Sequence, residues 1–112
     1  MKIKKLQSSA AEAESLLKAM ANQARLMILC ELLGGERTVT ELHLAVGLAM
    51  SAMSQHLAKL REEGIVATRR ESQTIYYSLA SEPAEKMLAV LYEIFCAPAE
   101  KSAAKKKQRS TT

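Results

Sequence analysis

The sequence predicts a mainly helical domain with one small β-hairpin. Apolar residues recur with a helical period in five stretches between residues 9 and 96. The exception is residues 65–79, where apolar and polar residues alternate with a period of two. A length of 112 residues is typical of a single domain, so these elements are expected to share one core.

The positive charge of the chain is concentrated at its two ends. The net charge is +4, although residues 9–96 contain eight Lys and Arg against eleven Glu. The overall charge is therefore weak evidence for a nucleic-acid partner, and the placement of single cations matters more. We expect a flexible basic arm over residues 1–8, a folded domain over 9–96 and a disordered basic tail over 97–112.

The folded domain is expected to begin with two helices. Residues 9–21 place apolar side chains on one side and charged side chains on the other. Asn22 suits the N-cap of a second helix over residues 23–33. This second helix is strongly apolar and is expected at the centre of the core, and Gly34-Gly35 would end it.

Residues 39–60 predict two short helices joined by a turn at Gly47. In the second of them, Met53, Leu57 and Leu60 share one face. The opposite face is small and polar and ends in a cation; it comprises Ser51, Ser54, Gln55, Ala58 and Lys59. Such a face can lie in a DNA major groove, where Ser and Gln contact base edges and Lys contacts phosphate. An ordinary solvated helix has the same composition, so the neighbouring elements must decide.

The hairpin is predicted from two β-rich runs, residues 65–70 and 74–79, around a short turn. A hairpin directly after a helix-turn-helix is the layout of a winged helix-turn-helix. Arg69 and Arg70 lie beside the hairpin tip, where they could reach phosphate or the minor groove. Alternatively, they only protect a sheet edge, as charged residues often do.

A last helix is predicted from Pro83 to Cys96, with proline in its first turn. Its apolar residues cover most of the circumference, so the helix must be buried on more than one side. In so short a chain, the second cover is expected to be another copy of the same protein. This predicts a two-fold homodimer that forms through the last helix and the first one.

Two segments carry a specific family resemblance. Residues 51–66 read SAMSQHLAKLREEGIV, and the hairpin reads TRRESQTIYYSL. Together with the preceding LLKAMANQARLMILCELLGGERTVTEL, they resemble the ArsR/SmtB family of winged-helix repressors over roughly residues 13–96. The resemblance implies a dimeric repressor that releases operator DNA when an inducer binds. The residues that match the recognition-helix motif are Ser51, Ser54, Gln55 and His56.

The expected partner is therefore double-stranded DNA with an inverted-repeat operator. The residues expected to contact DNA are Ser51, Ser54, Gln55, His56 and Lys59 in the major groove, with Arg69 and Arg70 from the hairpin. His56 lies about 60° from the apolar centre of its helix. It could contact phosphate or hold the helix against the core. The family often has Ser-Gln before the motif, where this chain has Ala49 and Met50, so a glutamine that could read adenine is absent at this position.

The residues do not favour a metal as the inducer. Many family members bind metal through Cys-x-Cys at the start of the third helix, where this chain has Thr38 and Thr40. Others bind zinc through Asp, His and Glu of the last helix, which here contains no His and no Asp. Both histidines, His43 and His56, lie in the helix-turn-helix. We expect no metal or other cofactor, and a metal site shared between two chains stays as an alternative.

Cys30 near the end of the second helix and Cys96 at the end of the last one resemble the BigR/SqrR-type subgroup. In that subgroup two cysteines sense sulfide-derived persulfides, and their oxidation weakens DNA binding. From the residues alone, Cys30 fits a core position. At a helix C-terminus the dipole disfavours the thiolate of Cys96. The resemblance therefore implies a Cys30–Cys96 sensor for reactive sulfur species, with a peroxide or electrophile sensor as the alternative.

No enzymatic activity is expected, because neither cysteine has a nearby base or anion-binding loop for a sulfur-transfer reaction. The sequence contains no apolar run of membrane-spanning length. The first residues also lack the apolar region of a signal peptide. The expected location is the reducing cytoplasm, where structural disulfides are rare.

Overall fold

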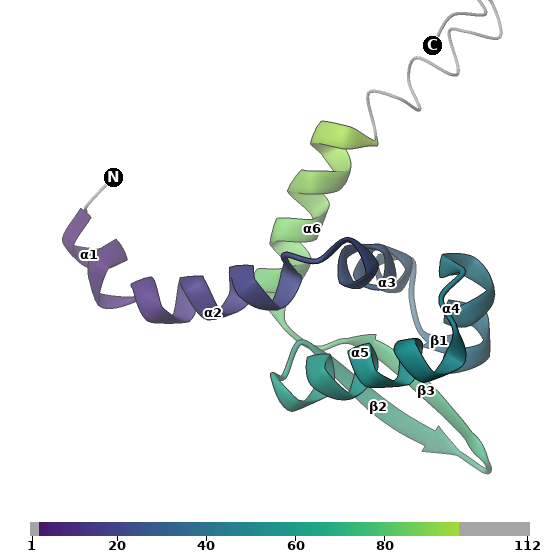
Figure 1. Cartoon of the computed structure of the whole chain (residues 1–112). Helices are drawn as coiled ribbons and strands as arrows, with labels where there is room; N and C mark the ends of the chain where they lie inside the picture. The colour runs from purple at the N-terminus through teal and green to yellow at the C-terminus, as the bar shows by residue number, and fades with distance from the viewer. Residues whose placement is uncertain (1–2, 97–112) are drawn as a thin grey trace, which may run out of the picture.

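The computed structural model describes residues 3–96 of the chain (Figure 1). Its elements, in order, are α1 (Ile3–Ser8), α2 (Ala10–Met20), α3 (Gln23–Leu33), β1 (Arg37–Thr38), α4 (Val39–Val46), α5 (Met50–Glu62), β2 (Val66–Glu71), β3 (Thr74–Leu79) and α6 (Glu82–Phe95). This order confirms the mainly helical winged helix-turn-helix. The tail predicted over residues 97–112 lies outside the described residues.

The sheet has three antiparallel strands in the described part of the chain, in the order β1-β3-β2. The hairpin of β2 and β3 agrees with the prediction, but β1 was not predicted, because two residues are too few to show a period. Arg37 pairs with Tyr77, and Thr38 pairs with Tyr76. Since α4 begins directly after Thr38, β1 ties the sheet to the helix-turn-helix.

The core lies between α3, the helix-turn-helix, the sheet and α6. Helix α3 contributes Ile28, Leu29 and Leu32, which agrees with its predicted central position. The other buried apolar residues are Ala19, Met20, Leu42, Met53, Leu57, Leu60, Ile65, Val66, Ala84 and Leu88. From residue 3 to residue 96, no helix combines the length and the apolar character that a membrane span requires.

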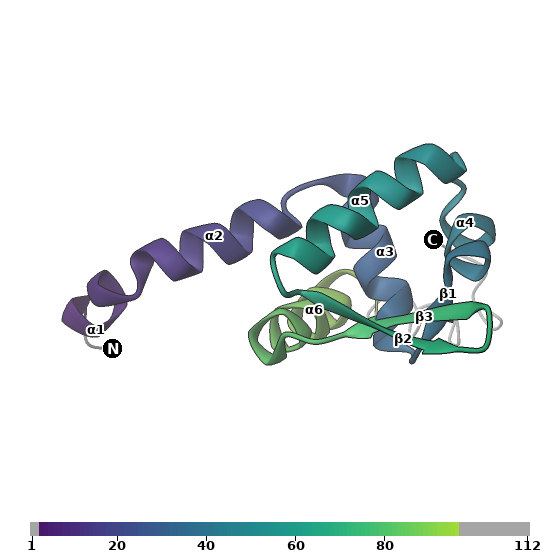
Figure 2. The same cartoon turned by 90° about the horizontal axis from the view of Figure 1, so that it is seen from below.

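Helices α1 and α2 project from the rest of the molecule as an arm, and both views show this (Figures 1 and 2). Helix α2 buries only Ala19 and Met20 at its C-terminal end, and α1 buries no residue. The sequence predicts a loose arm over residues 1–8, whereas residues 3–8 form a helix. Ile3 and Leu6 have the i, i+3 spacing of a helix face, a short signal that the prediction did not use.

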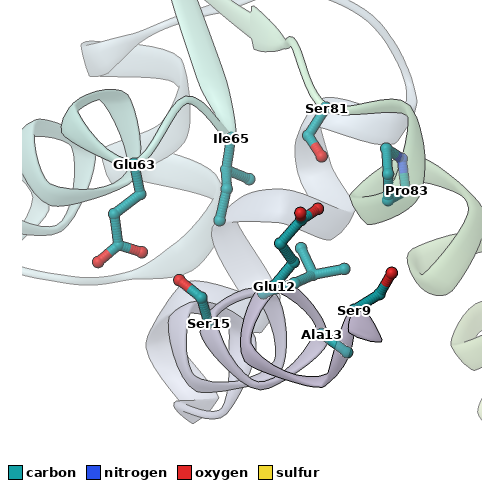
Figure 3. A pocket seen from close by; sticks show the side chains of 9 residues that line it. Ser9, Glu12, Ala13, Ser15, Glu63, Ile65, Ser81 and Pro83 are labelled. Carbon is teal, nitrogen blue, oxygen red and sulfur yellow. The ribbon is translucent and has the colours of Figure 1, made fainter. Parts of the chain in front are cut away.

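A cavity of about 470 Å³ separates the arm from the body at the point where they meet. It lies between α2, the end of α5 and the start of α6. Glu12, Ile65 and Ser81 are among the residues that line it (Figure 3). Within residues 3–96, the apolar residues of α2 that pack against the core are Leu16, Ala19 and Met20, all in its C-terminal half.

Local side-chain signals set the boundaries of the helices around the turn. The Asn22 side chain accepts a hydrogen bond from the Arg25 backbone N–H, as expected of an N-cap. Thr38 and Glu41 form a complete capping box at the start of α4. Gly47 ends α4 with φ at 82°, a left-handed conformation that residues with a side chain rarely adopt. The angle between α4 and α5 thus depends on this glycine.

Candidate nucleic-acid interface and dithiol pair

Helix α5 turns its predicted recognition face to solvent. Met53, Leu57 and Leu60 on the inner face are at most 1% exposed, so they fix the rotation of the helix about its own axis. The residues of the outer face are all exposed; they are Ser51, Ser54, Gln55, Ala58 and Lys59. The structure therefore presents a row of hydroxyl, amide and ammonium groups that could reach base edges and phosphates.

Lys59 lies at the end of this face and pairs with Glu63 one turn later, at 3.6 Å. The Lys59 side chain is about half exposed, and exposed i, i+4 pairs contribute little to stability. A phosphate could therefore replace the Glu63 carboxylate as the partner of this ammonium group at small cost.

His56 lies at the edge of the face and is half-buried. Its Nδ1 accepts a hydrogen bond from Arg25 Nε at 3.4 Å, which requires the tautomer with the proton on Nε2. The same guanidinium donates to the Ala19 carbonyl at 3.3 Å. Arg25 thus connects α2, α3 and α5, and its contact favours the supporting role of His56 over the phosphate contact.

The turn between the two helices carries a contact that the sequence analysis missed. His43 on α4 hydrogen-bonds through Nδ1 to the Leu48 carbonyl, across the left-handed Gly47. The available signal was the position of His43 in the last turn of a helix that ends at glycine. This bond holds the start of α5 against α4 and so helps to orient the recognition face.

Arg69 and Arg70 lie on opposite faces of the hairpin, because successive strand residues alternate. Arg70 shares its face with the buried Val66, and its Nε donates to the Ser72 carbonyl in the turn at 3.2 Å. Arg69 lies on the outer face, directly opposite Tyr76 in the β2–β3 register. The two arginines, which the sequence treats as equivalent, thus have different surroundings.

Arg69 already has three partners within the subunit. Its Nε donates to Glu36 Oε2 at 2.7 Å, and its Nη1 donates to Glu71 Oε2 at 2.8 Å. The guanidinium carbon lies 4.4 Å from the centre of the Tyr76 ring, a cation–π distance. These hydrogen bonds raise the pKa of Arg69, and the bond from Arg69 lowers the pKa of Glu36.

The structure places the two cysteines on neighbouring helices. Cys30 lies on α3 and Cys96 caps α6, two helices that pack against each other, and both thiols are free and half-buried. Burial raises the pKa of Cys30 above its ordinary value of 9.0, with further increases from Cys96 and Glu31.

A thiol with a raised pKa is expected to be slow to alkylate. In a Cys96→Ser variant, Cys30 should react with iodoacetamide more slowly at neutral pH than free cysteine does, because only the thiolate is nucleophilic. The rate should keep rising with pH beyond 9.0. Mass spectrometry of timed samples across a pH series measures this rate, and a midpoint below 9.0 would contradict the assignment.

Comparison with known proteins identifies the family. Residues 22–68 match the family model described as bacterial regulatory protein, arsR family. The transcriptional activator HlyU of Vibrio cholerae is 46% identical over 96 residues, which are 86% of this chain and 89% of that protein. The chain belongs to the ArsR family. Members of the ArsR family are DNA-binding transcription regulators and not enzymes, so this chain is a regulator too.

Other ArsR-family relatives agree over most of the chain. The biofilm growth-associated repressor of Agrobacterium fabrum is 45% identical over 95 residues, 85% of this chain and 81% of that protein. The crystal structure of the transcriptional repressor BigR from Xylella fastidiosa is 40% identical, with a TM-score of 0.81 over 86% of this chain and 98% of that one. The structure of reduced HlyU from Vibrio cholerae has 47% sequence identity to this chain and a TM-score of 0.78. The match covers 82% of this chain and 97% of that one. These relatives confirm the resemblance, including that to the BigR group.

Proposed function

We propose that this ArsR-family protein is a dimeric repressor that loses affinity for operator DNA when reactive sulfur species oxidise Cys30 and Cys96. The main support is the location of the two free thiols on α3 and at the end of α6, two helices that pack against each other. A link between them would join α3, which packs against α4, to α6. The Agrobacterium fabrum relative and BigR of Xylella fastidiosa are both named repressors, which supports repression as the direction of control.

In the complex with DNA, α5 lies in the major groove. Ser51, Ser54 and Gln55 contact base edges, and Lys59 contacts phosphate, because all four are exposed on one face. Arg70 extends from the hairpin tip to phosphate. Two copies related by a two-fold axis bind an inverted repeat, with half-sites about one helical turn, or a multiple of it, apart.

The dimer forms through α6 and the arm of α1 and α2. On α6, Met87, Val90 and Ile94 are exposed along one stripe, and Ile94 is 56% exposed. On the arm, Ile3, Leu6 and Leu17 are more than half exposed. Apolar surface of this extent marks an interface, and a second copy supplies a matching surface by symmetry.

The proposed oxidation proceeds in two steps. The Cys30 thiolate attacks the outer sulfur of a persulfide RSSH, which gives Cys30–SSH and the thiolate RS⁻; RS⁻ then takes up the proton that the Cys30 thiol released, and becomes RSH. Closure to a trisulfide with Cys96 then removes two hydrogen atoms, which a second RSSH accepts as RSH and H₂S. A direct disulfide requires Cα atoms within about 7 Å, whereas a bridge with an additional sulfur can span more. Peroxide supplies no sulfur for such a bridge.

The test is a titration of labelled DNA from the protein's own upstream region, with and without glutathione persulfide. Treatment should weaken binding about 5- to 150-fold, the usual range of coupling between two sites. The variants Cys30→Ser and Cys96→Ser should bind as untreated wild type does and should not respond. Intact mass should show additional sulfur in the product.

A response that persists in both variants would contradict the sensor assignment. Hydrogen peroxide forms the second arm of the experiment. Equal loss of affinity with peroxide and a product without additional sulfur would favour the peroxide-sensing alternative.

The remaining expectations concern metal and location. Among residues 3–96, no group of three or more His, Cys, Asp and Glu is arranged to hold a metal ion. The metal-responsive alternative would therefore need ligands from elsewhere, and zinc titration by calorimetry tests it.

We place the protein in the cytoplasm, where a bacterial regulator has access to the chromosome.

A further inference from the structure

One arginine fastens all three strands on the outer face of the sheet. Arg69 lies on β2, at the opposite edge from β1. Its guanidinium lies over Tyr76 of the middle strand and reaches Glu36, the residue before β1. A second bond holds Glu71 at the end of β2. The contact between Arg69 and Glu36 spans 33 positions in the sequence, so it is a tertiary link and not a local one.

This link joins the wing, the hairpin of β2 and β3, to the start of the helix-turn-helix. Glu36 precedes a strand of two residues, and Thr38 of that strand is also the N-cap of α4. So short a strand has few backbone bonds to hold it. The side-chain bond of 2.7 Å from Arg69 to Glu36 is therefore an additional connection between the wing and the start of the helix-turn-helix.

The charges around Arg69 argue against a phosphate contact. One guanidinium faces two carboxylates, so Arg69, Glu36 and Glu71 together carry one net negative charge. A DNA phosphate would have to displace oxygens that lie 2.7 and 2.8 Å away. Arg70, by contrast, forms no ion pair within residues 3–96 and lies on the opposite face, towards the layer that contains α5.

We propose that Arg69 is a positioning residue that sets the angle of the wing relative to the helix-turn-helix, and that Arg70 makes the phosphate contact of the wing. This inference rests on the proposed DNA binding and adds a division of roles between two adjacent arginines. Glu36 is part of the same device. Its carboxylate increases DNA affinity even though it carries the charge that DNA repels.

The sign of one substitution tests this directly. Glu36→Gln keeps the shape of the side chain and removes one negative charge. The matched control is Glu62→Gln, which removes the same charge from an exposed position on α5. Glu36→Gln should weaken DNA binding about 2- to 5-fold, the range expected for one exposed ion pair. Glu62→Gln should leave binding unchanged or strengthen it. A gain of affinity in Glu36→Gln would overturn the proposal.

The salt dependence of binding separates the two arginines. Arg70→Ala should lower the slope of log Kd against log salt by about 0.9, the value for one phosphate contact on duplex DNA. Arg69→Lys should weaken binding as much as Glu36→Gln does and leave the slope unchanged, because lysine keeps the charge but loses the planar fork. Arg69→Ala, which removes the charge, should also leave the slope of log Kd against log salt unchanged. A reduced slope in Arg69→Ala would overturn the proposal.

A readout without DNA keeps this inference separate from the proposed function. Hydrogen–deuterium exchange of the hairpin amides, residues 66–79, should become faster in Glu36→Gln and Arg69→Lys, but not in Glu62→Gln. If wild type binds no DNA, the proposed function fails, and the exchange experiment still decides whether Arg69 holds the wing. Unchanged exchange in both variants would overturn the positioning role.

Discussion

Replacement of Leu57 by alanine is expected to lower the free energy of unfolding by about 2–5 kcal/mol. Leu57 is 1% exposed and lies at the centre of the inner face of α5. The loss combines the transfer energy of the removed methyl groups with the cavity that they leave. Because domains of this kind have about 5–15 kcal/mol in total, the substitution removes a large share of the stability.

Urea denaturation followed by circular dichroism measures this change, at a fixed protomer concentration because dimerisation contributes to apparent stability. The matched control is Ser54→Ala on the exposed face of the same helix, which should change stability by less than about 0.5 kcal/mol. Equal stability of the two variants would mean that α5 is rotated relative to the described orientation.

Ile94→Glu is expected to separate the dimer and to weaken operator binding by about 10²- to 10⁴-fold. Ile94 is exposed in the apolar stripe of α6, where a carboxylate would have to be buried without a partner. A monomer binds one half-site and loses the gain that comes from two linked contacts. Sedimentation velocity and DNA titration on the same sample measure both effects.

Ala89→Glu is the control for this experiment. It adds the same carboxylate to an exposed position of α6, about 140° around the helix from Ile94. This variant should stay dimeric and bind DNA as wild type does. A dimer that survives Ile94→Glu would show that the copies meet elsewhere.

The main helices and the hairpin could be predicted because each has a period that repeats within its own length. The helix at Gln23–Leu33 and the strand at Thr74–Leu79 have the bounds that the pattern predicts. Helix α1 and strand β1 lack such a signal. The first has six residues, and the second has two, so neither completes enough periods to be recognised.

The candidate site was predictable where its residues belong to one helix and not where they depend on distant partners. The period alone places Gln55 on the face of α5 opposite Leu57. By contrast, the partner of His56 is Arg25, and the partner of Arg69 is Glu36, at separations of 31 and 33 residues. Such pairings depend on how α3 and the sheet pack together, which no local pattern encodes.

Arg25 offers three elements a common point of attachment. Its guanidinium donates one hydrogen bond from Nη1 to the Ala19 carbonyl in the last turn of α2. It donates another from Nε to His56 on α5. Since a guanidinium is rigid, its two hydrogen-bond directions cannot swing separately. A change in the direction of the arm would therefore act on the orientation of α5 both through the buried end of α2 and through the guanidinium of Arg25.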